Sequence, residues 1–156
     1  MRLHLGAGKK YWPGWHNVDL EGDQDTVCDI TKLPFNNDSV DEIQAIHVFE
    51  HLHRINAIDA LNEWRRVLKP GGKLVLEMPC YDKIISMINS GEKNLRMTMF
   101  GLFGDPNEAG EFMGHQWCWS KDELEKQVKT CGFDVDITDP KFHFVQRDMR
   151  CEAIKS

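Results

Sequence analysis

Two glycines in the stretch Leu3-His4-Leu5-Gly6-Ala7-Gly8, followed closely by Asn17-Val18-Asp19, constrain this chain most. The pattern predicts a strand, a glycine turn and a second strand that ends in a carboxylate. Glycine lets the backbone approach a ligand where a Cβ would collide. A carboxylate at a strand end can accept hydrogen bonds from both hydroxyls of a ribose. We therefore expect a nucleoside-bearing ligand at the carboxyl edge of a parallel sheet.

The spacing of this motif argues against a dinucleotide. A dinucleotide fingerprint needs a third glycine at the start of a helix and an acid about 20 residues later. Here Tyr11 stands in the place of the third glycine, and Pro13 and Gly14 prevent a helix of useful length. Without a helix N-terminus to hold a pyrophosphate, the sequence favours a ligand with one ribose and no phosphate over NAD or FAD.

The composition is that of an ordinary globular domain. The chain has 156 residues, 41% of them hydrophobic, and a net charge of −6, so we expect one domain over residues 1–156. No long cluster of Lys and Arg is present and no apolar run could span a bilayer, so neither a nucleic acid nor a membrane is an expected partner. The five cysteines form no Cys-x-x-Cys pair. We expect reduced thiols in the cytoplasm and no metal site.

Periodicity predicts alternating strands and helices. Strands are expected at 3–5, 16–20, 27–30, 39–46, 73–78, 133–138 and 147–154, and helices at 55–68, 82–89 and 121–130. A capping box, Ser120 to Glu123, begins the last helix. Residues 94–119 are rich in Gly, Phe, Met and Trp without a clean period, which predicts an irregular aromatic cap. The alternation predicts an α/β doubly wound, mostly parallel sheet, with an antiparallel hairpin at the C-terminal edge.

Several motifs together resemble class I S-adenosylmethionine-dependent methyltransferases. They are the glycine motif, Asn17-Val18-Asp19, Asp29-Ile30 before Leu33-Pro34-Phe35, Ser39-Val40-Asp41-Glu42-Ile43 leading to His47-Val48-Phe49-Glu50-His51-Leu52, Glu63-Trp64-Arg65-Arg66-Val67-Leu68-Lys69-Pro70-Gly71-Gly72, and Cys131-Gly132-Phe133. The resemblance spans nearly the whole chain, apart from the cap. It implies a small, Rossmann-like methyltransferase fold, S-adenosylmethionine as the cofactor and S-adenosylhomocysteine as the product.

The resemblance also implies cofactor-binding residues. Leu5, Gly6, Ala7 and Gly8 would line the methionine part of the cofactor. Asp19 would bind the ribose hydroxyls, and Asp29 and Ile30 would flank the adenine. Ile46 and His47, at the end of the fourth strand, would approach the transferable methyl group.

This chain departs from the family pattern in two places. His4 replaces the acid that the family often has two positions before the first glycine, so a partner for the cofactor's ammonium group is missing. The helices around the second strand are also abbreviated. The pocket is then expected to be open on that side or closed by Tyr11 and Trp12, and a homodimer could compensate.

Methyl transfer from a sulfonium needs alignment and exclusion of water, and a base if the acceptor is a hydroxyl or an amine. Histidine suits this task near neutral pH, and the two candidates are His47 and His115. Tyr81, His115 and Trp117 are candidates for contact with the acceptor. The apolar cap favours a small molecule or a saccharide as that acceptor.

Two alternatives come from other functional classes. The missing acid and the shortened helices are compatible with a non-catalytic module that only binds the cofactor or a partner. The sequence His47-Val48-Phe49-Glu50-His51 also matches the inverted zinc-protease signature, which suggests a zinc hydrolase. That signature needs both histidines on one helical face, whereas His47 is expected to precede the helix.

Overall fold

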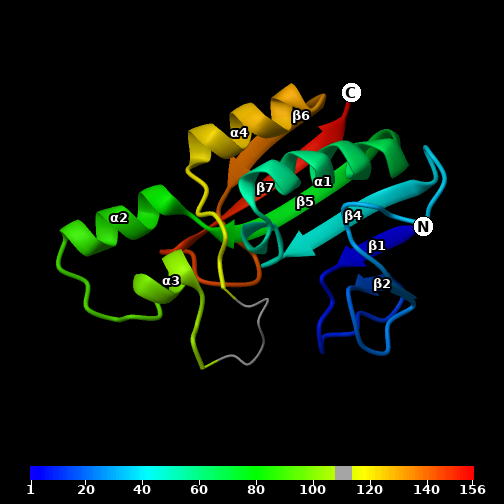
Figure 1. The fold of residues 1–156 in the computed structure, drawn as a ribbon. Helices are drawn as coiled ribbons and strands as arrows, with labels where there is room; N and C mark the ends of the chain where they lie inside the picture. Colours follow the sequence, from blue (N-terminus) through cyan, green and yellow to red (C-terminus); the bar gives the residue numbers. More distant parts are fainter. Residues whose placement is uncertain (108–113) are drawn as a thin grey trace.

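The computed structural model describes residues 1–107 and 114–156. Its elements run along the chain as shown in Figure 1. They are β1 (Arg2–Leu5), β2 (His16–Asp19), β3 (Thr26–Val27), β4 (Val40–Ile46), the 3-10 helix η1 (Phe49–His51), α1 (Arg54–Val67), β5 (Leu68–Pro79), α2 (Tyr81–Asn89), α3 (Met99–Phe103), α4 (Lys121–Thr130), β6 (Phe133–Thr138) and β7 (Asp148–Lys155).

Within the described residues the strands form one seven-stranded sheet in the order β3-β2-β1-β4-β5-β7-β6. The first five strands in this order are parallel to one another. β7 is antiparallel to both β5 and β6. The expected mostly parallel, Rossmann-like sheet and its antiparallel C-terminal edge are therefore confirmed.

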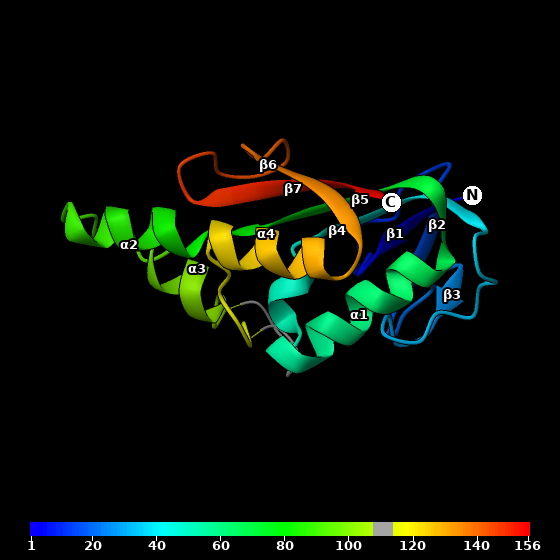
Figure 2. The ribbon, with the colours of Figure 1, turned by 90° about the horizontal axis from the view of Figure 1, so that it is seen from above.

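Helices α1 and α4 cover the same face of the sheet, as the view in Figure 2 shows. In α1 the apolar positions Ala57, Leu61 and Trp64 recur at helical spacing and are fully buried. They pack against Leu5 and Leu76 and their same-face neighbours in the sheet. The helix α4 begins as its capping box predicts, because the Ser120 hydroxyl accepts the Glu123 N–H at 3.2 Å.

The opposite face of the sheet is polar. The described chain has no helix between β1 and β2 or between β2 and β3, which agrees with the abbreviated helices expected from the sequence. Side chains on this face include His4, Gln44, Glu77 and Arg150, which pair in register across the strands. The sheet therefore has one face covered by helices and one that is stabilised largely by its own polar side chains.

Three details differ from the sequence-based expectations. The third strand ends at Val27 rather than at 30, because the Asp29 carboxylate accepts the Thr31 N–H at 2.8 Å and turns the chain. β5 begins at Leu68, before the glycine pair, and its pairing with β4 shifts register there. The expected cap at 94–119 contains the short helix α3, and its residues 108–113 lie outside the described residues.

No described helix has both the length and the apolar character needed to cross a membrane.

Candidate functional site

The glycine turn after β1 is tied to the end of β2 by one carboxylate. Asp19 Oδ2 accepts the Gly8 N–H at 2.7 Å, and Oδ1 accepts the Leu20 N–H at 2.6 Å. The Gln24 side-chain amide donates to the Gly8 carbonyl at 2.7 Å. Each carboxylate oxygen has more than one acceptor position, so Asp19 can hold the loop and still accept hydrogen bonds from a ligand.

The two glycines of the turn serve different purposes. Both have positive φ, +65° at Gly6 and +53° at Gly8, which favours glycine. A Cβ on Gly6 would collide with the Val48 side chain, so this glycine permits close packing against the chain after β4. A Cβ on Gly8 would meet no described atom within 4 Å. The backbone at Gly8 therefore faces open space, where a ligand can approach.

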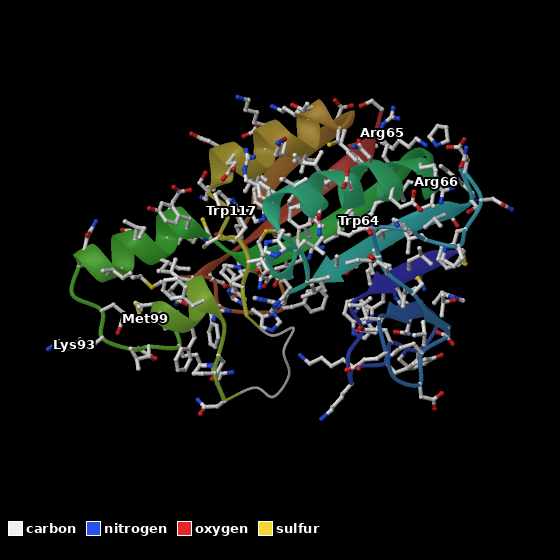
Figure 3. The ribbon with its side chains drawn as sticks, in the orientation of Figure 1. Trp64, Arg65, Arg66, Lys93, Met99 and Trp117 are labelled. Carbon is white, nitrogen blue, oxygen red and sulfur yellow. The ribbon has the colours of Figure 1, made fainter. Side chains whose placement is uncertain are left out.

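The other residues expected to bind the cofactor lie at, or shortly after, the carboxyl ends of strands. Leu5 and Ala7 are buried, and the Ala7 N–H donates to the Val18 carbonyl at 3.2 Å. Ile46 ends β4 and is partly buried. The Ile30 carbonyl accepts the Trp64 indole N–H at 2.9 Å, which fixes the turn to α1; Trp64 is labelled on that helix in Figure 3. The Ile30 N–H has no hydrogen-bond partner within the described ranges.

His4 is not part of an open pocket. Its ring is 3% exposed and stacks on Trp12, with 3.9 Å between ring centroids and 9° between the planes. Its Nδ1 lies 3.0 Å from Asn17 Oδ1. Burial lowers the pKa of His4, against the smaller opposing effect of Asn17. Trp12 therefore closes over β1 itself, and Tyr11 remains exposed with its hydroxyl 3.2 Å from Asp25.

His47 lies at the end of β4, in an unusual conformation and between two carboxylates. Its φ is +54°, which is uncommon outside glycine, and its N–H donates to the Glu77 carbonyl at 2.8 Å. Its Nδ1 is 2.8 Å from Glu50 Oε1. Its Nε2 is 3.4 Å from Asp148 Oδ2, which makes this contact an ion pair more than a hydrogen bond. The ring also lies on His143, with centroids 4.0 Å apart.

These contacts decide the charge of His47. Burial opposes the protonated ring, but Glu50 and Asp148 outweigh burial and raise the pKa to about 9. The Glu50 carboxyl is itself buried, which favours its neutral form, yet His47 keeps its pKa below the ordinary value. At neutral pH these contacts favour an imidazolium at His47 beside a carboxylate at Glu50.

His115 is brought close to η1 by backbone hydrogen bonds. The N–H groups of Gln116 and Trp117 both donate to the Glu50 carbonyl, at 2.8 and 3.2 Å. His115 Nδ1 lies 3.0 Å from the Gly101 carbonyl. Its ring meets that of His51 edge to face, with centroids 5.0 Å apart. Burial lowers the pKa of His115, while Glu50 opposes that effect. This histidine is therefore neutral at neutral pH.

The remaining acceptor candidates are Tyr81 and Trp117, and both are exposed. Tyr81 begins α2 and is 44% exposed, and its N–H donates to the Trp119 carbonyl. Trp117 lies before α4 (Figure 3), with its indole N–H 3.1 Å from Glu123 and Arg54 over its ring. Trp119 is fully buried and stacks on Phe49, so it belongs to the core. Of the two cap tryptophans, Trp117 is the one that a ligand can reach.

The motif of the zinc-hydrolase alternative does not lie on one helix. η1 begins at Phe49, after His47, and has three residues. Moreover, Nδ1 of His47 is engaged by Glu50. The arrangement that an inverted zinc-protease signature requires, two histidines four apart on a helical face, is not formed by His47 and His51.

A surface hollow of about 520 Å³ lies elsewhere, and Asn37, Arg65, Gly132 and Lys155 are among its lining residues. It faces the amino ends of the parallel strands, where Arg65 and Arg66 end α1 (Figure 3). Nucleotide-type ligands bind at the carboxyl ends of such strands. This hollow is therefore separate from the candidate site.

Sequence reasoning missed two buried acids from distant parts of the chain: Asp148, whose carboxylate pairs with the His47 ring, and Glu77, whose carbonyl accepts the His47 N–H. Asp148 and Glu77 are fully buried, and Glu77 accepts three backbone N–H groups from residues Lys141, Phe142 and His143 at 2.8–3.1 Å. One signal was available, since Glu77 interrupts the apolar run Leu74-Val75-Leu76 before Met78. A charged residue inside a buried strand needs a partner.

Comparison with known proteins gives two kinds of similarity. A family model for the methyltransferase domain matches residues 16–76. An uncharacterized protein of Methanocaldococcus jannaschii is 40% identical over 60 residues, which cover 38% of this chain and 25% of that protein. The chain thus spans about a quarter of the length of this curated relative.

Solved structures share the fold over the whole chain. One is an S-adenosylmethionine-dependent methyltransferase of Thermotoga maritima, described as a possible histamine N-methyltransferase. It has a TM-score of 0.69 and 14% identity, and the match covers 99% of this chain and 82% of that one. Another is the 1,6-didemethyltoxoflavin-N1-methyltransferase of Burkholderia thailandensis, with a TM-score of 0.67, 14% identity and coverage of 99% and 70%. The fold that the resemblance implied is thereby confirmed, and the family model supports the resemblance over residues 16–76.

Proposed function

Because this chain has the class I methyltransferase fold and matches the methyltransferase-domain family over residues 16–76, we propose that it transfers a methyl group from S-adenosylmethionine to a small acceptor. The family supports this cofactor, as does the Burkholderia neighbour, whose structure contains S-adenosylhomocysteine and its small-molecule substrate. We also propose that residues 1–156 act as one domain, which is supported by the shared sheet and core.

The observation that carries the proposal is the turn at Gly8. Its backbone faces open space, and the Asp19 carboxylate stands beside it at the end of β2. We assign Asp19 to the ribose hydroxyls and the backbone of residues 5–8 to the methionine part. Asp29 and Ile30 flank the adenine, where the free Ile30 N–H is a suitable donor. Ile46 and His47 border the methyl end, since β4 pairs directly with β1.

The two candidate histidines have different roles in this proposal. His47 is protonated at neutral pH and held by Glu50 and Asp148, so it positions groups at the methyl end and carries a charge. His115 is neutral, and its Nδ1 donates to the Gly101 carbonyl. Its Nε2 therefore keeps a lone pair and can accept the proton of an acceptor hydroxyl or amine.

The acceptor lies on the side of Tyr81, His115 and Trp117 in this proposal. Exposed aromatic rings beside a polar nitrogen suit a small metabolite or a saccharide. The proposal needs no second chain, although a homodimer could cover the polar face of the sheet. The five unpaired cysteines suit a reducing compartment such as the cytoplasm.

The first test is calorimetric titration of the protein with S-adenosylmethionine and S-adenosylhomocysteine, with NAD as a control. We expect one-to-one binding of the sulfur compounds and none of NAD. In the Asp19→Ala variant, loss of charge-assisted hydrogen bonds should weaken binding by about 2 kcal/mol, or about 30-fold. Asp23→Ala is the matched control, because Asp23 is an exposed acid in the same loop.

Three results would count against the proposal. If neither sulfur compound binds, S-adenosylmethionine is not the cofactor. If Asp19→Ala leaves the affinity for these compounds unchanged, Asp19 does not bind the ribose. Binding without methyl transfer to any acceptor in a metabolite screen would favour the non-catalytic module. The observation that supports a non-catalytic module is that the buried, neutral His4 replaces the usual acid.

A further inference from the structure

Glu50, His51 and His115 converge at one point beside the proposed methyl-transfer site. One ligand atom from each residue lies within 4.8 Å of those of the other two. The sequence separates His115 from the other two by more than sixty residues, so only the fold forms this cluster. The family resemblance assigns no role to it, and the proposed methyl transfer requires only His115.

The carboxylate of this cluster is incompletely satisfied. Glu50 is 1% exposed, and its Oε1 is paired with His47 Nδ1 at 2.8 Å. Its Oε2 is buried and has no hydrogen-bond partner in the part of the chain that the structure describes. A buried, unpaired carboxylate oxygen is costly and calls for a cation or a donor. Oε2 of Glu50 is therefore the atom of the cluster that needs a bound cation or a hydrogen-bond donor.

The two histidines are set up to offer lone pairs. His51 Nδ1 lies 3.3 Å from the Gly114 carbonyl, and His115 Nδ1 lies 3.0 Å from the Gly101 carbonyl. A carbonyl only accepts, so each Nδ1 carries the proton and each Nε2 keeps its lone pair in the neutral ring. Metal-binding histidines are commonly held in this way, with the other ring N–H donated to a carbonyl.

The backbone keeps the three residues together. Gln116 and Trp117 donate their N–H groups to the Glu50 carbonyl, and the His115 N–H donates to the Phe103 carbonyl at 3.1 Å. The segment that bears His115 is thus attached both to η1, which bears Glu50 and His51, and to α3. A metal site needs ligand atoms that are held in fixed positions, because an ion tolerates little error in ligand position.

We propose that Glu50, His51 and His115 form a binding site for a divalent transition-metal ion, with Zn²⁺ as the first candidate. Two imidazoles and one carboxylate are a ligand set that zinc accepts while keeping a further position open for an oxygen ligand. That position would suit an acceptor hydroxyl, a step that rests on the proposed function. In the metal-loaded protein His115 is a ligand, and its role as proton acceptor belongs to the metal-free protein.

The test is calorimetric titration of chelator-treated, tag-free protein with ZnCl₂, without S-adenosylmethionine. We expect one ion per chain, and at least a tenfold loss of affinity in His51→Ala and in His115→Ala. His53→Ala is the matched control, because His53 is an exposed histidine just before α1 and outside the cluster, and it should bind like the wild type. Titration with CoCl₂ should give the visible absorption bands of a low-coordinate cobalt site, which both variants should lose.

Wild-type protein that binds neither ion would overturn the proposal, and a proton shared by Glu50 and a histidine would then satisfy Oε2. Equal binding by the wild type and both folded variants would also overturn it. If a variant does not fold, anomalous scattering from native crystals soaked in ZnCl₂ decides, since an ion absent from the cluster refutes the site. Asp19→Ala should bind ZnCl₂ normally, so failure of the cofactor proposal is distinguishable from failure of this one.

Discussion

The two faces of the sheet are stabilised by different interactions, one mainly by buried apolar side chains and the other largely by polar ones. One face carries Leu5, Ile43 and Leu76, which are fully buried under α1 and its neighbours. The other face carries His4 and Gln44, which pair in register, and Arg150, which pairs in register with Glu77. In the described chain no helix joins β1 to β2 or β2 to β3. Figure 2 shows how α1 and α4 gather on a single side.

The polar face is held by an ordered network of charged side chains in addition to the buried Val75. Lys73 pairs with Glu152 at 2.7 Å, and Arg150 bridges Glu152 and Glu77 at 2.6 and 3.2 Å. Toward the carboxyl edge, Glu77 also holds the backbone of 141–143. The comparison teaches that a sheet with one helical layer can remain ordered when the other face satisfies its own charges across the strands.

The largest effect is expected on the helical face, at Trp64. Trp64→Ala removes a fully buried ring and the hydrogen bond to Ile30, and should lower the free energy of unfolding by about 4 kcal/mol. Urea denaturation followed by circular dichroism measures this. Trp117→Ala, at a partly exposed tryptophan, should cost less than about 1 kcal/mol. Equal losses in the two variants would contradict the idea of a one-sided core.

Adjacent residues of β5 give a direct comparison of the faces. Leu76 and Val75 are both fully buried but point to opposite sides. Leu76→Ala should destabilise by about 3 kcal/mol, because it leaves a cavity under α1. Val75→Ala should cost about 1.5 kcal/mol, near the transfer free energy of the removed methyl groups alone. Thermal unfolding of both variants checks the order, and a larger loss for Val75→Ala would reverse the comparison.

The polar face should depend on pH through Glu77. Burial raises the pKa of this carboxyl, but hydrogen bonds from His143, from the backbone and from Arg150 lower it from 4.5 to about 2. A depressed pKa contributes stability above the unfolded value, and this is lost as the pH falls from about 4.5 towards about 2. Glu77→Gln should lower the free energy of unfolding by about 2 kcal/mol at pH 7. In this variant stability should also fall less steeply between pH 4.5 and about pH 2.

The control for this change is Glu42→Gln, a partly buried acid on the same face whose carboxylate accepts a hydrogen bond from Gln44. Chemical denaturation at several pH values between 2 and 7 distinguishes the two variants. If both change this pH dependence equally, Glu77 has no special role, and the network on this face contributes only general electrostatics.

The smallest effect is expected at the rim of the polar face. Lys73→Met breaks the contact with Glu152, but the Lys73 side chain is 37% exposed, so the change should be about 0.5 kcal/mol. Differential scanning fluorimetry in low and high salt measures it, and the difference from wild type should shrink in salt. A loss comparable with that of Glu77→Gln would show that the network acts as one unit.

Much of this fold could be predicted from the sequence because its signals are local. The strand–turn–strand at Gly6 and Gly8, the helical spacing in α1 and the capping box at Ser120 each depend on residues a few positions apart. The position of Asp19 at the end of β2 followed in the same way. The third strand was too long in the prediction because the Asp29 turn depends on side-chain hydrogen bonds, from the Thr31 N–H and hydroxyl to the Asp29 carboxylate.

The sequence by itself therefore determined the order of the elements, the parallel sheet and the glycine turn after β1, since periodicity and glycine act within one segment. Only the tertiary structure decided the charge of His47, which depends on Glu50 nearby and on Asp148 from β7. It also decided that His115 joins Glu50 and His51, and that Glu77 anchors 141–143. These contacts join residues far apart in the chain, and their energies depend on burial, which no local pattern reports.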